Sequence, residues 1–226
     1  MVYPILSFIS ETFILIPIFV LYRTYSSWNK NQVMKLLMWL VCSYFILYVA
    51  VLPSDIMLLL GKDAPNSIFF YNWHYILAGY LKLAIYYSLL NIRYKKWLIW
   101  LLVAIITMFV LFEFKTDSLI YIFTGHFATK TYVIINLFII VLSLLYAYQL
   151  LQDLSVEDIT QYSFFWLNSG FLIYHIGSIS IYSFVGNGAT EEEGKIAWVV
   201  NSILLFVLYY AITASFYYSK NLSKKT

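Results

Sequence analysis

Seven runs of apolar residues, each long enough to cross a lipid bilayer, occupy most of this 226-residue chain. A transmembrane helix needs about 20 consecutive, mostly apolar residues, because the hydrocarbon core of a bilayer is about 30 Å thick. The sequence therefore predicts an all-α, polytopic membrane protein, a single bundle of seven transmembrane helices over residues 1–226. We place these helices near residues 4–22, 33–53, 68–91, 97–114, 131–150, 162–184 and 195–218.

The composition agrees with lipid as the main solvent of the chain. Hydrophobic residues make up 62% of it and charged residues only 11%, whereas a soluble domain is about half apolar and about a quarter charged. These proportions exclude a free soluble enzyme, a nucleic-acid-binding domain and a disordered chain. We expect the lipid bilayer to be the main partner, and no nucleic acid.

The Lys and Arg residues between the runs predict the orientation, because cytoplasmic loops carry an excess of positive residues. One set of loops carries nine of them and the other set carries four. We therefore expect the N-terminus outside, the C-terminus in the cytoplasm, and a multi-pass protein of the bacterial inner (cytoplasmic) membrane. The nine are Arg23, Lys30, Lys35, Arg93, Lys95, Lys96, Lys220, Lys224 and Lys225, and the four are Lys62, Lys115, Lys130 and Lys195.

Two charged residues lie inside the predicted helices, where a charge costs about 2.5–3.5 kcal/mol on insertion scales. Glu11 lies in the first run and Lys82 in the third. Both runs cross the membrane in the same direction and a lysine side chain is long, so we expect Glu11 and Lys82 to pair. Pro17 has no N–H, and we expect it to leave the Phe13 carbonyl free and so add polarity nearby.

Further polar residues fall in the same outer half of the predicted bundle. His74 and Lys82 lie eight residues apart, so they share one face of the third helix. We interpret these side chains as a candidate ligand-binding pocket that opens to the outside. The alternative is that they only hydrogen-bond neighbouring helices together. The candidate residues are Glu11, His74, Lys82, Asn136, His175 and Asn201.

Two other patterns bear on packing. Small residues in the sixth run, including Gly170 and Gly177, predict that this helix approaches its neighbours closely and lies centrally. Aromatic residues are 21% of the chain, and many lie near predicted helix ends. We interpret these first as an aromatic belt and only second as a ligand cage. Examples are Trp28, Tyr71, Trp73, Tyr94, Trp97, Trp198, Tyr217 and Tyr218.

No motif indicates catalysis or a cofactor. The sequence has no HExxH, no GxSxG and no glycine-rich phosphate loop. Residues 196–219 lack the lysine that a retinal protein carries in its last helix. The three histidines, His74, His126 and His175, do not have metal-ligand spacing. We therefore expect no catalytic residue, no metal and no cofactor, with an intramembrane hydrolase left open because Ser and His coexist in the helices.

Two loops on the predicted cytoplasmic side are candidate docking surfaces for a partner. The turn after the third helix is basic, and residues 152–161 carry three acids and no Lys or Arg. Ser155 and Asp158 also fit a capping pair that opens the sixth helix, and Thr190 with Glu193 fits a capping box that opens the seventh. The candidate docking residues are Arg93, Lys95 and Lys96 in the basic turn and Asp153, Glu157 and Asp158 in the acidic loop.

The later helices carry short patterns that resemble a known family. These are the segment 164–170 (FFWLNSG) followed by Tyr174 and Gly177, the segment 198–204 (WVVNSIL), and a Tyr-Asn pair at 71–72. They resemble a family of seven-helix integral membrane proteins of Bacteroidetes-type bacteria, often encoded beside sensor histidine kinases and response regulators. The resemblance implies a sensory or signalling role and brings no catalytic residues. Ser163 and His175 depart from the family pattern.

Together, these observations predict a non-enzymatic sensory or signalling module in the membrane. We expect its outer-half pocket to respond to a small-molecule ligand or to pH, and its partner to be a cytoplasmic or membrane kinase or regulator. One alternative is a small ion-coupled transporter or channel, although the sequence shows no internal repeat of the kind that many transporters contain. A second alternative is a membrane subunit or anchor of a larger complex.

Overall fold

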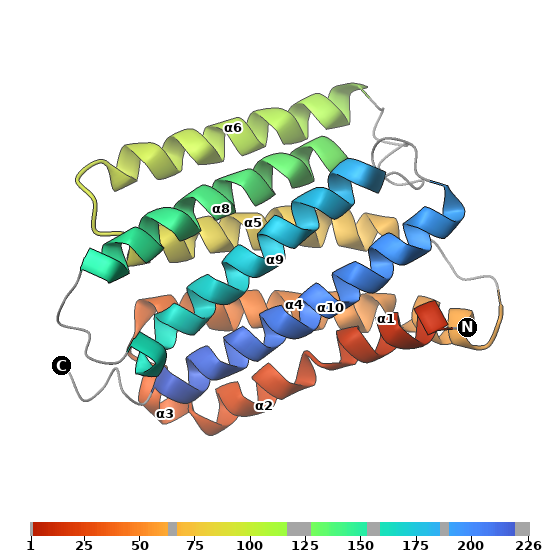
Figure 1. Cartoon of the computed structure of the whole chain (residues 1–226), viewed down its shortest axis with the longest axis horizontal. Helices are drawn as coiled ribbons and strands as arrows, with labels where there is room; N and C mark the ends of the chain where they lie inside the picture. The colour runs from red at the N-terminus through yellow and green to blue at the C-terminus, as the bar shows by residue number, and fades with distance from the viewer. Residues whose placement is uncertain (1, 63–66, 117–127, 153–158, 186–189, 220–226) are drawn as a thin grey trace.

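The computed structural model describes residues 2–62, 67–116, 128–152, 159–185 and 190–219, and the regular structure in these ranges is helical (Figure 1). Each predicted run coincides with a helix, except that the first is divided in two. A short helix α3 (Tyr25–Trp28) and a 3-10 turn (Ile159–Gln161) lie in connections. The long elements are α1 (Val2–Thr12) with α2 (Leu15–Arg23), α4 (Gln32–Leu59), α5 (Ile68–Leu89), α6 (Lys95–Thr116), α8 (Thr129–Gln152), α9 (Ser163–Val185) and α10 (Glu191–Tyr218).

Membrane character follows from the length and hydropathy of these helices. Within the described residues, five helices are long and apolar enough to cross a membrane: α4, α6, α8, α9 and α10. The helix α5, which carries Lys82, is not among them, and neither are the short helices α1 and α2. The prediction of a helical membrane protein is therefore confirmed at this level.

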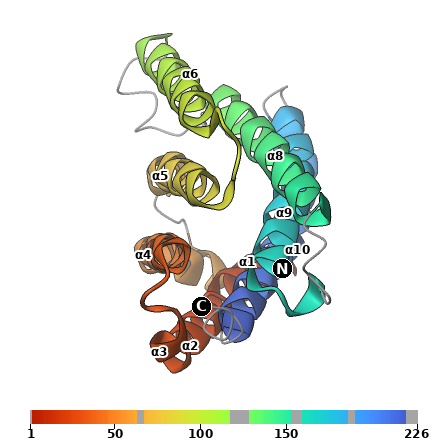
Figure 2. The ribbon, with the colours of Figure 1, turned by 90° about the vertical axis from the view of Figure 1, so that its left-hand side faces the viewer.

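The helices run along one common direction and form a bundle with a curved cross-section. Figure 2 shows α6, α8, α9 and α10 as a curved row, with α4 and α5 on its concave side. The helix α5 contacts α4, α6 and α8, while α1 and α2 pack against α10 and α4. This arrangement surrounds a space at the end of the bundle where α5, α8 and α10 begin.

The first predicted helix is broken at residues 13 and 14, and the expected free carbonyl at Phe13 is not there. Pro17 cannot donate to the Phe13 carbonyl. The Ile16 N–H donates to it instead, at 3.1 Å, and the Ile14 N–H donates to the Glu11 carbonyl at 3.2 Å. These tight three-residue bonds replace the regular helical pattern and separate α1 from α2.

The helix α4 continues six residues beyond the predicted end at residue 53. Pro53 lies inside it, so the proline does not stop the helix. The stop is at Gly61, whose φ of +66° favours glycine. There the Lys62 N–H donates to the Met57 carbonyl at 2.9 Å and the Gly61 N–H to the Leu58 carbonyl at 3.1 Å. This is a Schellman motif, in which the last carbonyls of the helix find donors.

The predicted close approach of the sixth run is confirmed by α9, which packs against both α8 and α10. A Cβ added at Gly170 would lie 2.3 Å from the Cβ of Ala211, and one added at Gly177 would lie 2.5 Å from Leu204 Cδ1. Real Cβ atoms do not approach other atoms this closely, so these glycines set the separation of α9 and α10.

Two helix starts are fixed by side chains. The predicted capping box at Thr190 and Glu193 is present: the Thr190 Oγ1 accepts from the Glu193 N–H, and the Glu193 carboxylate accepts from the Thr190 N–H at 2.8 Å. At the start of α8, the buried Glu113 carboxylate of α6 accepts from the N–H groups of Lys130 (2.9 Å) and Thr131 (3.1 Å). Glu113 thereby satisfies free helix N–H groups and ties α6 to α8.

Candidate functional site

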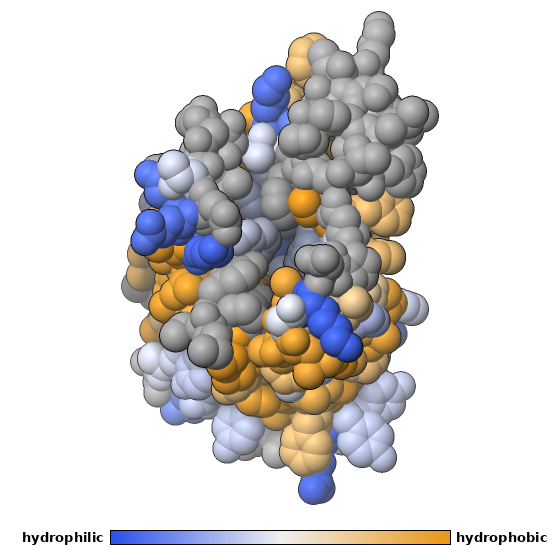
Figure 3. Space-filling view, turned by 90° about the vertical axis from the view of Figure 1, so that its right-hand side faces the viewer, coloured by the Kyte–Doolittle hydropathy of each residue, from blue (hydrophilic) through white to orange (hydrophobic). Residues whose placement is uncertain are grey.

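A cavity lined mainly by tyrosines lies in the half of the bundle where α5, α8 and α10 begin. Its volume is about 50 Å³, room for a few water-sized groups. Figure 3 looks at this end of the bundle and shows a hollow with hydrophilic residues around it. The residues that line the cavity are Glu11, Tyr44, Leu47, Tyr48, Tyr71, His74, Tyr75, Tyr132, Tyr174, Tyr182, Trp198, Asn201, Leu205 and Tyr209.

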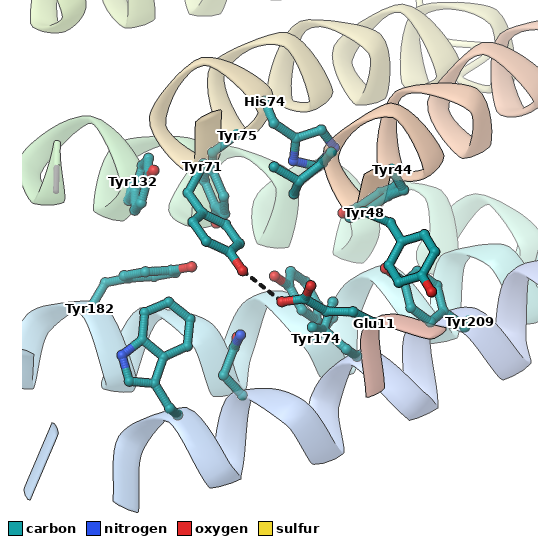
Figure 4. Close-up of a pocket in the computed structure, with 14 residues that line it drawn as sticks. Glu11, Tyr44, Tyr48, Tyr71, His74, Tyr75, Tyr132, Tyr174, Tyr182 and Tyr209 are labelled. Carbon is teal, nitrogen blue, oxygen red and sulfur yellow. Dashed lines mark hydrogen bonds between the residues drawn. The ribbon is translucent and has the colours of Figure 1, made fainter. Parts of the chain in front are cut away.

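The Glu11 carboxylate projects into the middle of this space. Figure 4 shows the hydroxyls of Tyr71 and Tyr182 turned towards it, and the Tyr71 hydroxyl donates to Glu11 Oε1 at 2.6 Å. The Asp55 carboxyl of α4 lies beside the Glu11 carboxyl. Glu11 Oε2 and Asp55 Oδ2 are buried and have no hydrogen-bond partner. The cavity wall therefore carries the Glu11 carboxyl group, with the Asp55 carboxyl group behind it, and each group has one oxygen without a partner.

Lys82 does not pair with Glu11. The predicted ion pair between these two residues is therefore wrong. The lysine is 2% exposed and lies below the cavity. Its ammonium group donates to the Tyr44 hydroxyl at 3.3 Å, and its Nζ lies 3.1 Å from His175 Nε2. The prediction failed because it compared only the depths of Glu11 and Lys82 along their own helices. Depth does not reveal which other helices, here those of Tyr44 and His175, lie next to Lys82.

The hydrogen bonds continue from His175 back to the cavity wall. If Lys82 donates to Nε2, then Nδ1 carries the hydrogen and donates to Asn136 Oδ1. The Tyr75 hydroxyl donates to the same Asn136 oxygen at 2.6 Å. The chain Tyr44–Lys82–His175–Asn136–Tyr75 therefore starts and ends on residues that line the cavity, and it links α4, α5, α8 and α9. We call it the floor network.

Aromatic rings surround the ammonium group of Lys82. Its Nζ lies 5.4 Å from the ring centre of Tyr174, 5.6 Å from that of Phe171, 5.9 Å from that of Tyr44 and 6.0 Å from that of Tyr75. At these distances a cation is attracted to the face of a ring. The rings offset part of the cost of burying the lysine, and three of them separate its ammonium group from the cavity above.

A second buried polar cluster lies one helical turn beyond Lys82. The Tyr86 hydroxyl donates to Asn168 Oδ1 at 2.9 Å and is hydrogen-bonded to Ser143 Oγ. The Asn168 amide donates to the Ser143 carbonyl at 3.2 Å. This cluster joins α5, α8 and α9 below the floor network.

The six predicted site residues thus fall into two connected groups. Glu11, His74 and Asn201 line the cavity, and Lys82, His175 and Asn136 form the centre of the floor network. His74 Nε2 lies 3.4 Å from Ser43 Oγ, and its ring packs edge-on against Tyr44. Asn201 Oδ1 is buried without a hydrogen-bond partner.

The tyrosines and Asp55 were missed by sequence reasoning. Of the aromatic residues interpreted first as a belt and second as a ligand cage, Tyr71 and Trp198 line the cavity, and Trp28 is buried, so the belt interpretation is wrong for Trp28. A usable signal was present in the spacing. Tyr71, Tyr75, Ala78 and Lys82 follow steps of four, three and four, and so do Trp198, Asn201, Leu205 and Tyr209 with steps of three, four and four. Such stripes place tyrosines on the faces that carry the polar residues.

The basic candidate docking residues lie at the opposite end of the bundle. Lys95 donates to the Leu90 carbonyl at 2.9 Å, and Arg93 lies over the ring of Tyr94. Lys96 is exposed. The acidic candidates Asp153, Glu157 and Asp158 lie outside the described residues, as does the proposed capping pair with Ser155.

No protein-family model matches the chain, and no curated protein or solved structure matches it.

The cavity carries groups that can form hydrogen bonds and hold charge. Among the described residues, no group of three or more His, Cys, Asp or Glu side chains is placed to hold a metal ion. The cavity instead offers carboxyl oxygens, an amide oxygen, phenol hydroxyls and aromatic faces. Such groups recognise a small molecule by hydrogen bonds and charge.

Proposed function

We propose that this chain is a non-enzymatic sensory or signalling module of the bacterial inner membrane, with its cavity open to the outside. The observation that supports the proposal is the floor network, because it begins and ends on cavity residues and joins four helices by buried hydrogen bonds. A ligand that changes the position of Tyr44 or Tyr75 changes a network shared by α4, α5, α8 and α9.

A ligand shifts such a system only if it binds two arrangements of the helices with different affinities. Buried hydrogen bonds between helices suit this purpose, since each has a made and an unmade state. In this proposal the helices α5 and α9 transmit the change to the opposite end of the bundle. There the basic turn at Arg93, Lys95 and Lys96 and the acidic residues 153–158 dock a kinase or response regulator. The resemblance to proteins encoded beside such kinases supports the same function.

The first test is capture of the tagged full chain from its native membrane in mild detergent, followed by mass spectrometry. We expect a histidine kinase or response regulator to be recovered with it. Arg93→Gln combined with Lys96→Gln should lower that recovery, and Lys30→Gln, an exposed charge removed on the same predicted side, should not. Recovery of the chain without a kinase or regulator would refute the signalling function.

A second test addresses the cavity itself. With the captured kinase in vesicles, Glu11→Gln and Lys82→Met should each change the rate of autophosphorylation. If both variants are folded and neither changes the rate, the cavity does not control the output.

An ion-coupled transporter or channel is the second candidate function, and the cluster at Tyr86, Ser143 and Asn168 favours it. Together with the floor network, this cluster extends buried polar groups beyond Lys82 towards the other end of the bundle. Flux of protons or sodium ions into vesicles that contain only this chain, lost in Lys82→Met, would establish this function instead. If no variant of a buried polar residue changes signalling or flux, the remaining function is that of a structural subunit or anchor in a larger complex.

A further inference from the structure

Two residues of the cavity wall have a buried acceptor oxygen without a donor, and a third such oxygen lies on Asp55 beside Glu11. Glu11 Oε2 and Asp55 Oδ2 belong to two carboxyl groups in contact, and both oxygens are unpartnered. Across the cavity Asn201, only 6% exposed, contributes an unpartnered amide oxygen. A buried acceptor without a donor has lost its hydration without gaining a hydrogen bond, and this penalty is larger when the group is charged. A ligand that brings N–H donors and positive charge removes this cost.

Lys82 does not already fill this role. Its ammonium group lies under the rings of Tyr44, Tyr75 and Tyr174 and bonds to Tyr44 and His175. In the described part of the chain, no lysine, arginine or histidine forms a hydrogen bond or ion pair with Glu11 or Asp55. The tyrosine rings around the cavity also favour a cation over an anion.

The size of the cavity restricts the cation. A volume of about 50 Å³ accommodates a few water-sized groups. A primary ammonium group on a methylene chain is of this size, whereas a trimethylammonium group is much larger. The arrangement of acceptors also suits a primary ammonium, which has three N–H donors.

A lipid-facing cleft adjoins the cavity. The cleft has a volume of about 350 Å³, lies between α4 and α5, and is lined mainly by apolar side chains. Figure 2 shows no helix of the drawn bundle covering this flank of α4 and α5. Leu47 and His74 line both the cleft and the cavity, so the two spaces are neighbours on either side of these residues. The lining residues are Ser43, Ile46, Leu47, Ala50, Phe70, Trp73, His74 and Leu77.

We propose that the ligand of this site is an amphiphilic primary amine that enters from the bilayer between α4 and α5. Its ammonium head binds Glu11 and Asn201 in the cavity, with the Asp55 carboxyl beside Glu11, and its alkyl tail lies in the cleft. The proposal rests on the cavity being the ligand site of the proposed function. The cleft alone would accept any acyl chain, but its position beside the unpartnered oxygens of Glu11 and Asn201 selects a cationic head.

The test is binding of radiolabelled dodecylamine to the purified full chain in a non-ionic detergent, measured by scintillation proximity. We expect saturable binding that Glu11→Gln weakens about tenfold or more, because a charge-assisted hydrogen bond is lost. Glu192→Gln, an exposed acid at the start of α10, is the matched control and should leave the affinity unchanged. Asn201→Leu provides a second binding variant if Glu11→Gln does not fold.

Competition experiments separate head from tail. Unlabelled dodecylamine should compete, while dodecanol, which has no charge, and dodecyltrimethylammonium, which has a larger head, should compete poorly. Ala50→Trp fills the cleft and should weaken dodecylamine without changing the weak competition by ethylamine. Equal competition by dodecanol and dodecylamine, or equal loss in Glu11→Gln and Glu192→Gln, would overturn the proposal. If the chain captures a kinase but does not bind dodecylamine, the proposed ligand is wrong and the proposed signalling function is still supported.

Discussion

Replacing Gly170 of α9 by alanine isolates the effect of one methyl group on the packing of two helices. The added Cβ would lie 2.3 Å from the Ala211 Cβ of α10, whereas carbon atoms in contact lie about 3.5–4.0 Å apart. The helices must therefore separate by roughly 1.2 Å or more at this point. Such a gap removes dispersion contacts along the seam, and overpacking of this kind typically costs about 1–3 kcal/mol.

The helix preference of alanine works in the opposite direction. Alanine is better than glycine in a helix interior by about 0.8–1.0 kcal/mol. Gly194→Ala in the first turn of α10 measures this preference without the clash, because an added Cβ there meets no atom within 4 Å. We expect Gly170→Ala to be less stable than Gly194→Ala by about 1–3 kcal/mol, the steric part alone.

The assay is reversible unfolding of the purified chain in mixed micelles, with the free energy of unfolding compared among variants. Gly170→Ala combined with Ala211→Gly moves the methyl group across the seam. Since the next nearest atom to the new Cβ is Ala211 Cα at 3.7 Å, this double variant should regain most of the lost stability. Equal stability of Gly170→Ala and Gly194→Ala, or no recovery in the double variant, would refute the close packing of α9 and α10.

Three further predictions use the same unfolding assay. Glu113→Ala should lower the free energy of unfolding by about 1.5–3 kcal/mol, because two N–H groups of α8 lose a charged acceptor; a neutral result would remove Glu113 as the link between α6 and α8. Tyr86→Phe should cost about 1 kcal/mol by leaving Asn168 Oδ1 without its donor, and no loss would mean that another group donates. Glu11→Gln and Lys82→Met should be additive within about 0.5 kcal/mol, since the two residues share no direct contact; a larger interaction energy would restore the ion pair.

The helical class and the helix positions could be predicted because lipid imposes a simple rule on length and hydropathy. The errors occurred where local backbone chemistry decides. The second helix was predicted to end near residue 53, yet α4 continues past Pro53 to the glycine stop at Gly61. Asp55 therefore lay outside the predicted second helix, and its contact with Glu11 could not be anticipated.

The candidate site was predicted in its residues but not in its connections. Glu11, His74 and Asn201 share a cavity as expected, because polar groups in a bundle turn inward. The partner of Lys82 was wrong, since the choice between Glu11 and His175 depends on how α1, α5 and α9 are arranged around one another. That arrangement depends on close contacts such as the one between Gly170 and Ala211. From a single sequence, a glycine shows only that some helix can approach closely, not which one.

The position of Lys82 also bears on how the chain enters the membrane during synthesis. The helix α5 is not among those apolar enough to cross a membrane by composition, and a central lysine opposes insertion by about 2.5–3.5 kcal/mol. The preceding helix α4 is strongly apolar, packs along α5 and supplies the Tyr44 hydroxyl to Lys82. We therefore expect α4 and α5 to insert as a hairpin. His175 is synthesised only after α6 and α8. Lys82 therefore lacks this hydrogen-bond partner until α9 has entered the membrane and packed into the bundle.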